Sequence, residues 1–337
     1  MNKKKLLLIL IVLFSILACS IDKESNYEVL EFDQIATLIS EISLDIDALG
    51  NTIRFRKHID GFIIMDGSAN KIYLFNNSGR LMHEFGGNGR GPGEFTRLTT
   101  VTSDEKGRIY AYDSSTWILT IFDETGNYIK SHKMESAFRM HDMVYADQRL
   151  FTFSGFTHDE LPYHINVINP EKGTIDNQFM RSSELVKQLG IPLTGSLQHI
   201  SAFQDKIIVT HPLQLITYYY DFEGNLIMAH EKDSQIFEDP DTNSYKIPEP
   251  LHKAMPLLIA SSRIAQNIVI IEYMDLRPDG IKGNFIDIFD TQGKRINTNP
   301  ISIGSAFLIN VNRNGELLFL NRRENSTKYR IAKYNLN

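Results

Sequence analysis

The sequence is poor in cysteine, because Cys19 is the only one in 337 residues. An internal disulfide is therefore excluded, and a folded domain has to be held together by its core. A basic excess is also absent, since 35 lysines and arginines stand against 41 aspartates and glutamates. This acidic balance argues against a nucleic-acid partner.

Long hydrophobic runs are missing too. The apolar run Leu6–Leu17 is shorter than the roughly 20 residues that a membrane-spanning helix needs. It follows Lys3, Lys4 and Lys5, which is the pattern of a secretory signal, so we predict a lipoprotein signal peptide over residues 1–18. Removing these three lysines from the 35 basic residues takes the formal net charge from −6 to −9.

Several catalytic motifs do not occur. The sequence contains no Gly-Lys-Ser or Gly-Lys-Thr, no Gly-x-Ser-x-Gly and no His-Glu-x-x-His. These absences remove the usual sequence evidence for a phosphate-binding loop, a serine hydrolase and a zinc peptidase. We therefore assign no catalytic residue from motifs.

What the sequence does contain is a β-rich repeat. Turn glycines occur at positions 79, 126, 173, 224 and 293, at intervals of 47, 47, 51 and 69 residues, each between two predicted strands. Glycine accepts the positive φ that such a hairpin turn requires. Another β-rich run precedes each hairpin, and a sixth unit ends the chain. The pattern predicts an all-β, six-bladed β-propeller of four-stranded antiparallel blades over residues 27–337.

The sixth unit ends before an outer strand can follow. We expect the N-terminus to supply it, because residues 27–32 alternate apolar and polar side chains, so that an N-terminal strand joins the last blade and closes the ring. Residues 231–260 contain four prolines and predict a long loop. A short helix is predicted over residues 34–43 from apolar side chains at helical spacing, namely Ile35, Leu38, Ile39 and Ile42.

The stretch of residues 86–94 holds five glycines, which raises the question of a phosphate site. A phosphate-binding loop needs a helix N-terminus behind it, and here a strand is predicted over residues 98–103. We therefore interpret the stretch as a crossing from blade one to blade two, with Phe95 inserted between the blades.

The sequence GGNGRGPGEF at residues 86–95, with GRIYAYD at 107–113 and LTIFDETGNYI at 119–129, resembles the NHL-repeat and TolB-like type of propeller. Residues 16–19, Ile-Leu-Ala-Cys, are similar to the lipobox of bacterial lipoproteins. Together they resemble the six-bladed β-propeller lipoproteins of the Bacteroidota. The resemblance implies a fold, an envelope location and a binding role rather than a reaction.

Cys19 is the predicted lipidation site, and residues 19–26 are the predicted tether. The alternatives are an ordinary residue in an uncleaved anchor and a buried thiol. Acyl chains on Cys19 would hold the domain at the bilayer without spanning it. Ser20 does not resemble an inner-membrane retention signal, so the outer membrane is favoured, on either its periplasmic or its surface face.

Arginines recur at the predicted entrances of the inner strands. Arginine holds carboxylates and phosphates through paired hydrogen bonds, so these residues predict recognition of an anionic group on a protein, peptide or glycan ligand. The alternative is that each arginine bonds a carbonyl or carboxylate of a neighbouring blade. The candidate ligand-binding residues are Arg56, Arg90, Arg97, Arg139 and Arg263.

An enzyme is the rival hypothesis. His58, His141 and His199 occupy comparable positions on three predicted inner strands, as a site for a divalent cation, calcium or zinc, would require in the central channel of a metal-dependent hydrolase or lyase. No acidic residues at matching positions would orient them. We favour a monomeric binding or scaffold module without a cofactor.

Overall fold

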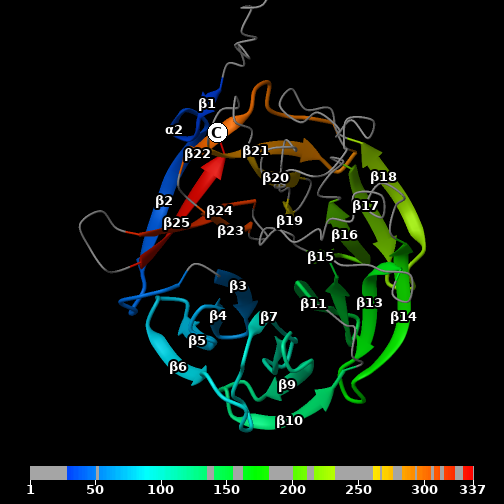
Figure 1. The fold of residues 1–337 in the computed structure, drawn as a ribbon. Coiled ribbons are helices and arrows are strands. Elements are labelled where there is room, and N and C mark those ends of the chain that lie inside the picture. Colours follow the sequence, from blue (N-terminus) through cyan, green and yellow to red (C-terminus); the bar gives the residue numbers. More distant parts are fainter. Residues whose placement is uncertain are drawn as a thin grey trace, which may run out of the picture.

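The computed structural model describes residues 29–50, 53–134, 140–154, 162–181, 200–210, 216–231, 261–265, 268–275, 283–292, 294–304, 307–311, 315–322 and 329–336. Six sheets, each with four antiparallel strands, are arranged around a central axis like the blades of a propeller (Figure 1). The predicted fold class and the number of blades are confirmed. The predicted signal peptide, residues 1–18, and tether, residues 19–26, lie outside the described residues.

Each of the first three blades is built from four consecutive strands, with the first strand innermost. Blade one contains β3 (Ile53–His58), β4 (Gly61–Asp66), β5 (Lys71–Asn76) and β6 (Leu81–Gly86). Blade two contains β7 (Leu98–Ser103), β8 (Ile109–Asp113), β9 (Ile118–Phe122) and β10 (Tyr128–Lys133). Blade three contains β11 (Asp142–Ala146), β12 (Arg149–Phe153), β13 (Tyr163–Asn169) and β14 (Thr174–Arg181).

The last three blades follow the same order, except where the N-terminal segment joins. Blade four contains β15 (Ile200–Phe203), β16 (Lys206–Thr210), β17 (Ile216–Asp221) and β18 (Leu226–Glu231). Blade five contains β19 (Ser261–Ala265), β20 (Ile268–Asp275), β21 (Gly283–Asp290) and β22 (Ile301–Gly304), with β1 (Leu30–Glu31) at its edge. Blade six contains β23 (Phe307–Val311), β24 (Leu317–Arg322), β25 (Tyr329–Leu336) and β2 (Ala36–Ser43).

The N-terminal segment closes the ring, as predicted. β2 pairs antiparallel with β25, from Ala36 opposite Leu336 to Ser43 opposite Arg330. The closing strand is not the one expected over residues 27–32, because β1 is short and pairs parallel with β22 in blade five. The helix α2 (Phe32–Ile35) then leads from β1 into β2.

The helix predicted over residues 34–43 is wrong, since residues 36–43 form the strand β2. The pairing of β2 shifts between Leu38 and Ser40, which makes Ile39 an extra, bulged residue. A bulge interrupts the period-two alternation of a strand. The apolar residues on either side of it therefore fall at a spacing that imitates a helix.

The hairpins between the third and fourth strands share one turn chemistry. Asp123 Oδ1 accepts hydrogen bonds from Thr125 N at 2.9 Å and Asn127 N at 2.8 Å, and Gly126 has a φ of 91°. Such short-range bonds from an Asx side chain favour a turn over a continued strand. The same combination occurs at Asn76 with Gly79 and at Asp221 with Gly224. The turn of blade three is one residue longer: Asn169 Oδ1 accepts from Glu171 N and Lys172 N, and Gly173 has the positive φ. Gly293 lies outside the described residues.

The core consists of six apolar clusters, one between each pair of neighbouring blades. Phe95, which is fully buried, lies between blades one and two and packs against Phe122 at a centroid distance of 6.2 Å. The strand β7 follows it, so residues 86–94 are a crossing between blades, as predicted. At the centre each inner strand contacts the next, and β23 contacts β3.

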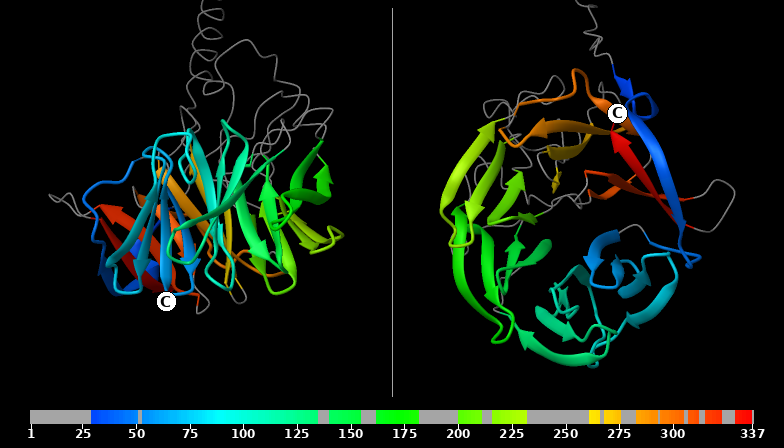
Figure 2. Two further views of the ribbon diagram at one scale, coloured as in Figure 1. Left: turned by 90° about the horizontal axis from the view of Figure 1, so that it is seen from below. Right: turned by 180° about the vertical axis from the view of Figure 1, so that it is seen from behind.

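The ring has two faces that carry different connections (Figure 2). Because neighbouring strands are antiparallel, the turns that join the first to the second strand and the third to the fourth strand of a blade lie on one side, here called the hairpin face. The crossings from blade to blade begin and end on the opposite side, here called the loop face. The glycine-rich residues 86–94 belong to the loop face.

Candidate functional site

One buried carboxylate joins the inner strands of four blades. Asp142, the first residue of β11, is fully buried. Its Oδ1 accepts a hydrogen bond from Thr100 Oγ1 in β7 at 3.2 Å and pairs with Arg56 in β3. Its Oδ2 accepts from Ile200 N, the first residue of β15, at 3.1 Å. Blades one to four are therefore joined at the centre of the ring.

Arg56 reaches from blade one to blade three. Besides its ion pair with Asp142, it donates from Nη1 to Phe55 O at 2.8 Å and from Nη2 to Met143 O at 3.4 Å. Arg54, two residues earlier, donates from Nη2 to His141 O at 3.5 Å. Arg56 thus has an internal carboxylate as its partner, which is the alternative that the sequence left open for the arginines.

Arg90 and Arg97 are exposed on the loop face, at the crossing from blade one to blade two. The crossing is fixed by its own bonds: Gly91 N donates to Glu94 Oε2 at 2.8 Å, and the Arg97 N–H donates to Asp113 Oδ2 at 3.2 Å. Two of the predicted arginines therefore present their side chains to solvent on this face. Arg139 lies outside the described residues, and Arg263 is described only as part of β19.

His58 and His141 lie at opposite ends of the inner strands. His58 ends β3 on the hairpin-face side, where its Nε2 is 2.9 Å from Gly107 O. His141 precedes β11 on the loop-face side, and its carbonyl is bonded by Arg54, four residues before His58 and roughly 13 Å away along a strand. His199 lies outside the described residues. Within those residues, no group of three or more His, Cys, Asp or Glu is placed to hold a metal.

Two aspartates that sequence reasoning missed fix the crossings into blades one and two. Asp113, at the end of β8, accepts hydrogen bonds from Thr96 N at 2.5 Å and from Arg97 N, and from two N–H groups of the following turn. Burial acts to raise the pKa of Asp113, but these N–H donors outweigh it and the pKa is lowered. Asp66, at the end of β4, likewise accepts from Gly50 N at 2.7 Å. The recurrent aspartate that ends GFIIMD and GRIYAYD is the sequence signal for this contact.

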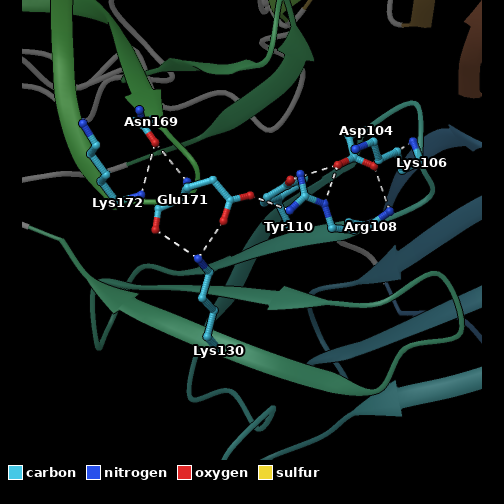
Figure 3. Close-up of polar contacts among 8 residues, drawn as sticks. All are labelled: Asp104, Lys106, Arg108, Tyr110, Lys130, Asn169, Glu171 and Lys172. Carbon is cyan, nitrogen blue, oxygen red and sulfur yellow. Dashed lines mark hydrogen bonds and ion pairs between the residues drawn. The ribbon is translucent and has the colours of Figure 1, made fainter.

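On the hairpin face, a charged network connects blades two and three (Figure 3). Glu171 accepts hydrogen bonds from Arg108 Nη1 at 2.5 Å and Lys130 Nζ at 2.8 Å. Arg108 Nε also donates to Asp104 Oδ2 at 2.8 Å, and Tyr110 donates to the same oxygen at 3.0 Å. The bonds from Lys130 and Arg108 lower the pKa of Glu171 to about 2.

The contact recurs between blades three and four. Arg149 begins β12 and pairs with Asp147 in its own blade and, at 3.4 Å, with Glu223 in the next. Its guanidinium lies 5.5 Å from the ring centroid of Phe151, as that of Arg108 lies 5.8 Å from Tyr110. The charges on this face are therefore used to join neighbouring blades.

A family model described as a 6-bladed beta-propeller, DUF5128, matches residues 20–241, which is more than half of the chain. The chain belongs to this family. No protein with a curated description matches the sequence. In the described part of this family member, no helix is long and apolar enough to cross a membrane.

Solved structures share the fold of this 6-bladed beta-propeller at low sequence identity. A protein of Bacteroides fragilis thought to be exported superposes with a TM-score of 0.68 at 14% identity, covering 92% of this chain and 98% of its own. A DUF4221 member from Bacteroides vulgatus gives 0.58 at 10%, covering 90% and 99%. A gluconolactonase of Xanthomonas campestris gives 0.52 at 10%, covering 89% and 98%. At these identities the likeness shows the fold alone.

The position of Asp142 predicts that Asp142→Ala lowers the free energy of unfolding by about 3–5 kcal/mol, because the partly buried guanidinium of Arg56 and two other donors lose their acceptor. Urea unfolding measures the change. Asp176→Ala, at an exposed carboxylate of the same blade, is the matched control and should change stability by less than about 0.5 kcal/mol. Adding Arg56→Ala to Asp142→Ala should recover part of the loss. Equal effects of Asp142→Ala and Asp176→Ala would contradict the role assigned to Asp142.

The network at Glu171 predicts a pH-dependent contribution to stability. Its folded pKa of about 2 is below the ordinary value of 4.5, so the contribution is complete above pH 4.5 and is lost as the pH falls toward 2. Glu171→Gln should lower the free energy of unfolding at pH 7 by less than about 1 kcal/mol, since the carboxylate is half exposed and screened. Thermal melts should show this difference vanishing at pH 2. A difference that stays constant with pH would contradict the prediction.

Proposed function

We propose that the chain is a lipoprotein of the bacterial envelope that acts as a binding or scaffold module. Cys19 carries the lipid, the outer membrane is the favoured location, and the propeller offers its loop face to a protein, peptide or glycan. The module needs no catalytic residue and acts by display from a rigid ring.

The anchoring is supported by the N-terminal sequence and by the position of β1 at the outer edge of a blade. Cys19 follows an apolar run and the small residue Ala18, as in a lipobox. The strand β1 pairs at Leu30 with the start of β22, at the outer edge of blade five. Leu30 is 11 residues after Cys19 in the sequence, so the proposed lipid and the first strand are close along the chain.

The observation that carries the binding role is the position of the blade-to-blade crossings. The glycine-rich crossing leaves β6 and enters β7 on the loop face, and the long segments 182–199 and 232–260 connect strand ends on the same face. Binding residues are typically carried by loops on a rigid scaffold. The longest connections between described strands therefore begin and end on this face.

The described arginines of the loop face favour an anionic group on the ligand. Arg90 and Arg97 are exposed there, whereas Arg56 is held inside by Asp142. Their guanidinium groups form paired hydrogen bonds with carboxylates or phosphates. An acidic peptide or an acidic glycan provides such groups.

The anchoring predicts that Cys19→Ser moves the protein from the membrane fraction to the soluble fraction, because the acyl chains are the only covalent link to the bilayer. Immunoblots of fractionated cells measure the distribution, and incorporation of labelled palmitate into the unchanged chain is the companion measurement. Ser20→Ala is the matched control and should leave the protein in the membrane fraction. Unlabelled protein in the soluble fraction would contradict the proposed anchor.

The binding role predicts that contacts with the ligand come from one face. A photo-crosslinking amino acid placed at Arg90 or Arg97, on the loop face, should give a discrete adduct in intact cells. The same amino acid at Arg80 or Lys172, exposed on the hairpin face, should give no adduct with that partner. Mass spectrometry of the adducts identifies the ligand. Adducts that form equally on both faces, or only on the hairpin face, would contradict the assignment of the loop face.

A further inference from the structure

Outer strands of five blades carry a β-bulge close to the hairpin face. In each case the pairing with the neighbouring strand skips one residue. A bulged residue has no partner in the hydrogen-bond ladder. It also interrupts the alternation of side chains along the strand, so that its own side chain can point away from the neighbouring blade. The skipped residues are Met82 in blade one, Ile129 in blade two, Asp176 in blade three, Ile227 in blade four and Ile39 in blade six.

Four of these five residues are large and apolar, and all four are about half exposed: 48% for Met82, 47% for Ile129, 47% for Ile227 and 44% for Ile39. Blade five presents Ile296, 56% exposed, in the segment that leads into β22. In blades one to four the residue lies three positions after the turn glycine, and Ile296 holds the same position after Gly293. We call Ile39, Met82, Ile129, Ile227 and Ile296 the apolar rim.

The apolar rim is centred on the point where the N-terminal segment enters the fold. It runs through the consecutive blades four, five, six, one and two, and β1 and β2 join blades five and six. Blade three, across the ring from blade six, carries Asp176 instead, which is exposed. From Cys19 to Leu30 the chain spans at most about 40 Å. A lipid on Cys19 would therefore lie within reach of the rim.

We propose that the apolar rim is a membrane-docking surface that seats the propeller on the bilayer in which Cys19 is anchored; this rests on the lipid anchoring proposed above. Half-exposed isoleucine and methionine side chains gain free energy when they enter the interfacial region of a bilayer. Packing does not require apolar side chains at these positions, since blade three folds with an aspartate in the same bulge. A single protein partner would contact one sector, whereas a lipid surface matches side chains spread over several blades around one edge.

The charges near the N-terminal segment indicate which lipid headgroups are sufficient for docking. Glu31 and Asp33 are exposed beside the apolar rim, and the chain is acidic as a whole. Docking therefore gains nothing from anionic headgroups and depends on apolar insertion. Vesicles of zwitterionic phosphatidylcholine are the appropriate probe, and the docking should change little between low and high salt.

Position-specific labelling tests the orientation, because Cys19 is the only cysteine and its sulfur is blocked by acylation. The acylated chain with Arg80→Cys or Arg90→Cys has one free thiol, on the hairpin face or on the loop face. Both are labelled with a polarity-sensitive fluorophore and reconstituted into phosphatidylcholine vesicles that contain a headgroup-bound quencher. The label at position 80 should be quenched and blue-shifted, and the label at position 90 should behave as in water. Equal, water-like signals at the two positions would overturn the proposal.

Aspartate substitutions test the side chains, since the bulge of blade three tolerates aspartate. Ile39→Asp with Ile227→Asp should lower docking, measured by quenching at position 80, by about tenfold or more. Asp176→Asn is the matched control at the equivalent bulge and should not weaken docking. Circular dichroism should show the same thermal melt for all variants. Undiminished quenching in the double variant would exclude the apolar rim as the docking surface.

A separate measurement distinguishes failure of the anchor from failure of the rim. Mass spectrometry of the N-terminus reports whether Cys19 is acylated. If Cys19 is acylated and the label at position 80 stays water-like, the docking proposal is overturned and the anchoring proposal stands. A chain without acyl groups overturns the anchor, and flotation with vesicles then tests the rim directly: the unchanged chain should bind about tenfold more strongly than the double aspartate variant. Equal flotation overturns the apolar rim as well.

Discussion

The pairing of β2 with β25 is the constraint on which the rest of the structure depends. A blade has two faces, and each is buried only if a neighbouring blade lies against it, so the ring has to be closed. The N-terminal segment provides the closure and packs Phe32 against Phe319 and Tyr334, each at a centroid distance of 4.9 Å. Because β2 begins on the hairpin-face side, the chain must enter the ring there. The side of the propeller on which the N-terminal segment meets the ring is therefore set by how the ring closes.

The architecture could be predicted because the signals for each blade lie within short stretches of the sequence. An Asx residue, a glycine of positive φ and apolar alternation recur within every 47 to 51 residues of the first four blades, and each signal acts over a few neighbours in the sequence. The closing strand was misplaced for a reason that is local too. The bulge at Ile39 shifts the alternation of β2, and a shifted strand resembles a helix when only the spacing of apolar residues is read. The same bulge in other outer strands displays the apolar rim.

The contacts between the inner strands could be predicted only in part, because they join residues that are remote in sequence. The pattern placed Arg56 on an inner strand, but its partner Asp142 is 86 residues away and two blades further on. The spacing of the repeats also predicted equivalent positions for His58 and His141, because spacing alone does not show where a strand begins or ends. His58 is the last residue of β3, and His141 comes just before β11, so strands that run in the same direction place the two residues at opposite ends. Strand register decides such positions, and a repeat pattern does not define it to within a residue.

The hairpin face and the loop face differ in the contacts that they make, and this difference suits them to different roles. On the hairpin face, Arg108 and Arg149 bind carboxylates of the next blade, and bulges turn apolar side chains outward. On the loop face, the Asp142 contacts join the inner strands of blades one to four, and Asp113 fixes the crossing that carries Arg97. The entries to β7 and β15 are therefore held by bonds from Asp113 and Asp142 that do not depend on the rest of the crossing. Sequence can change in a crossing without disturbing the ring, and a face built in this way suits recognition, while the opposite edge carries the apolar rim.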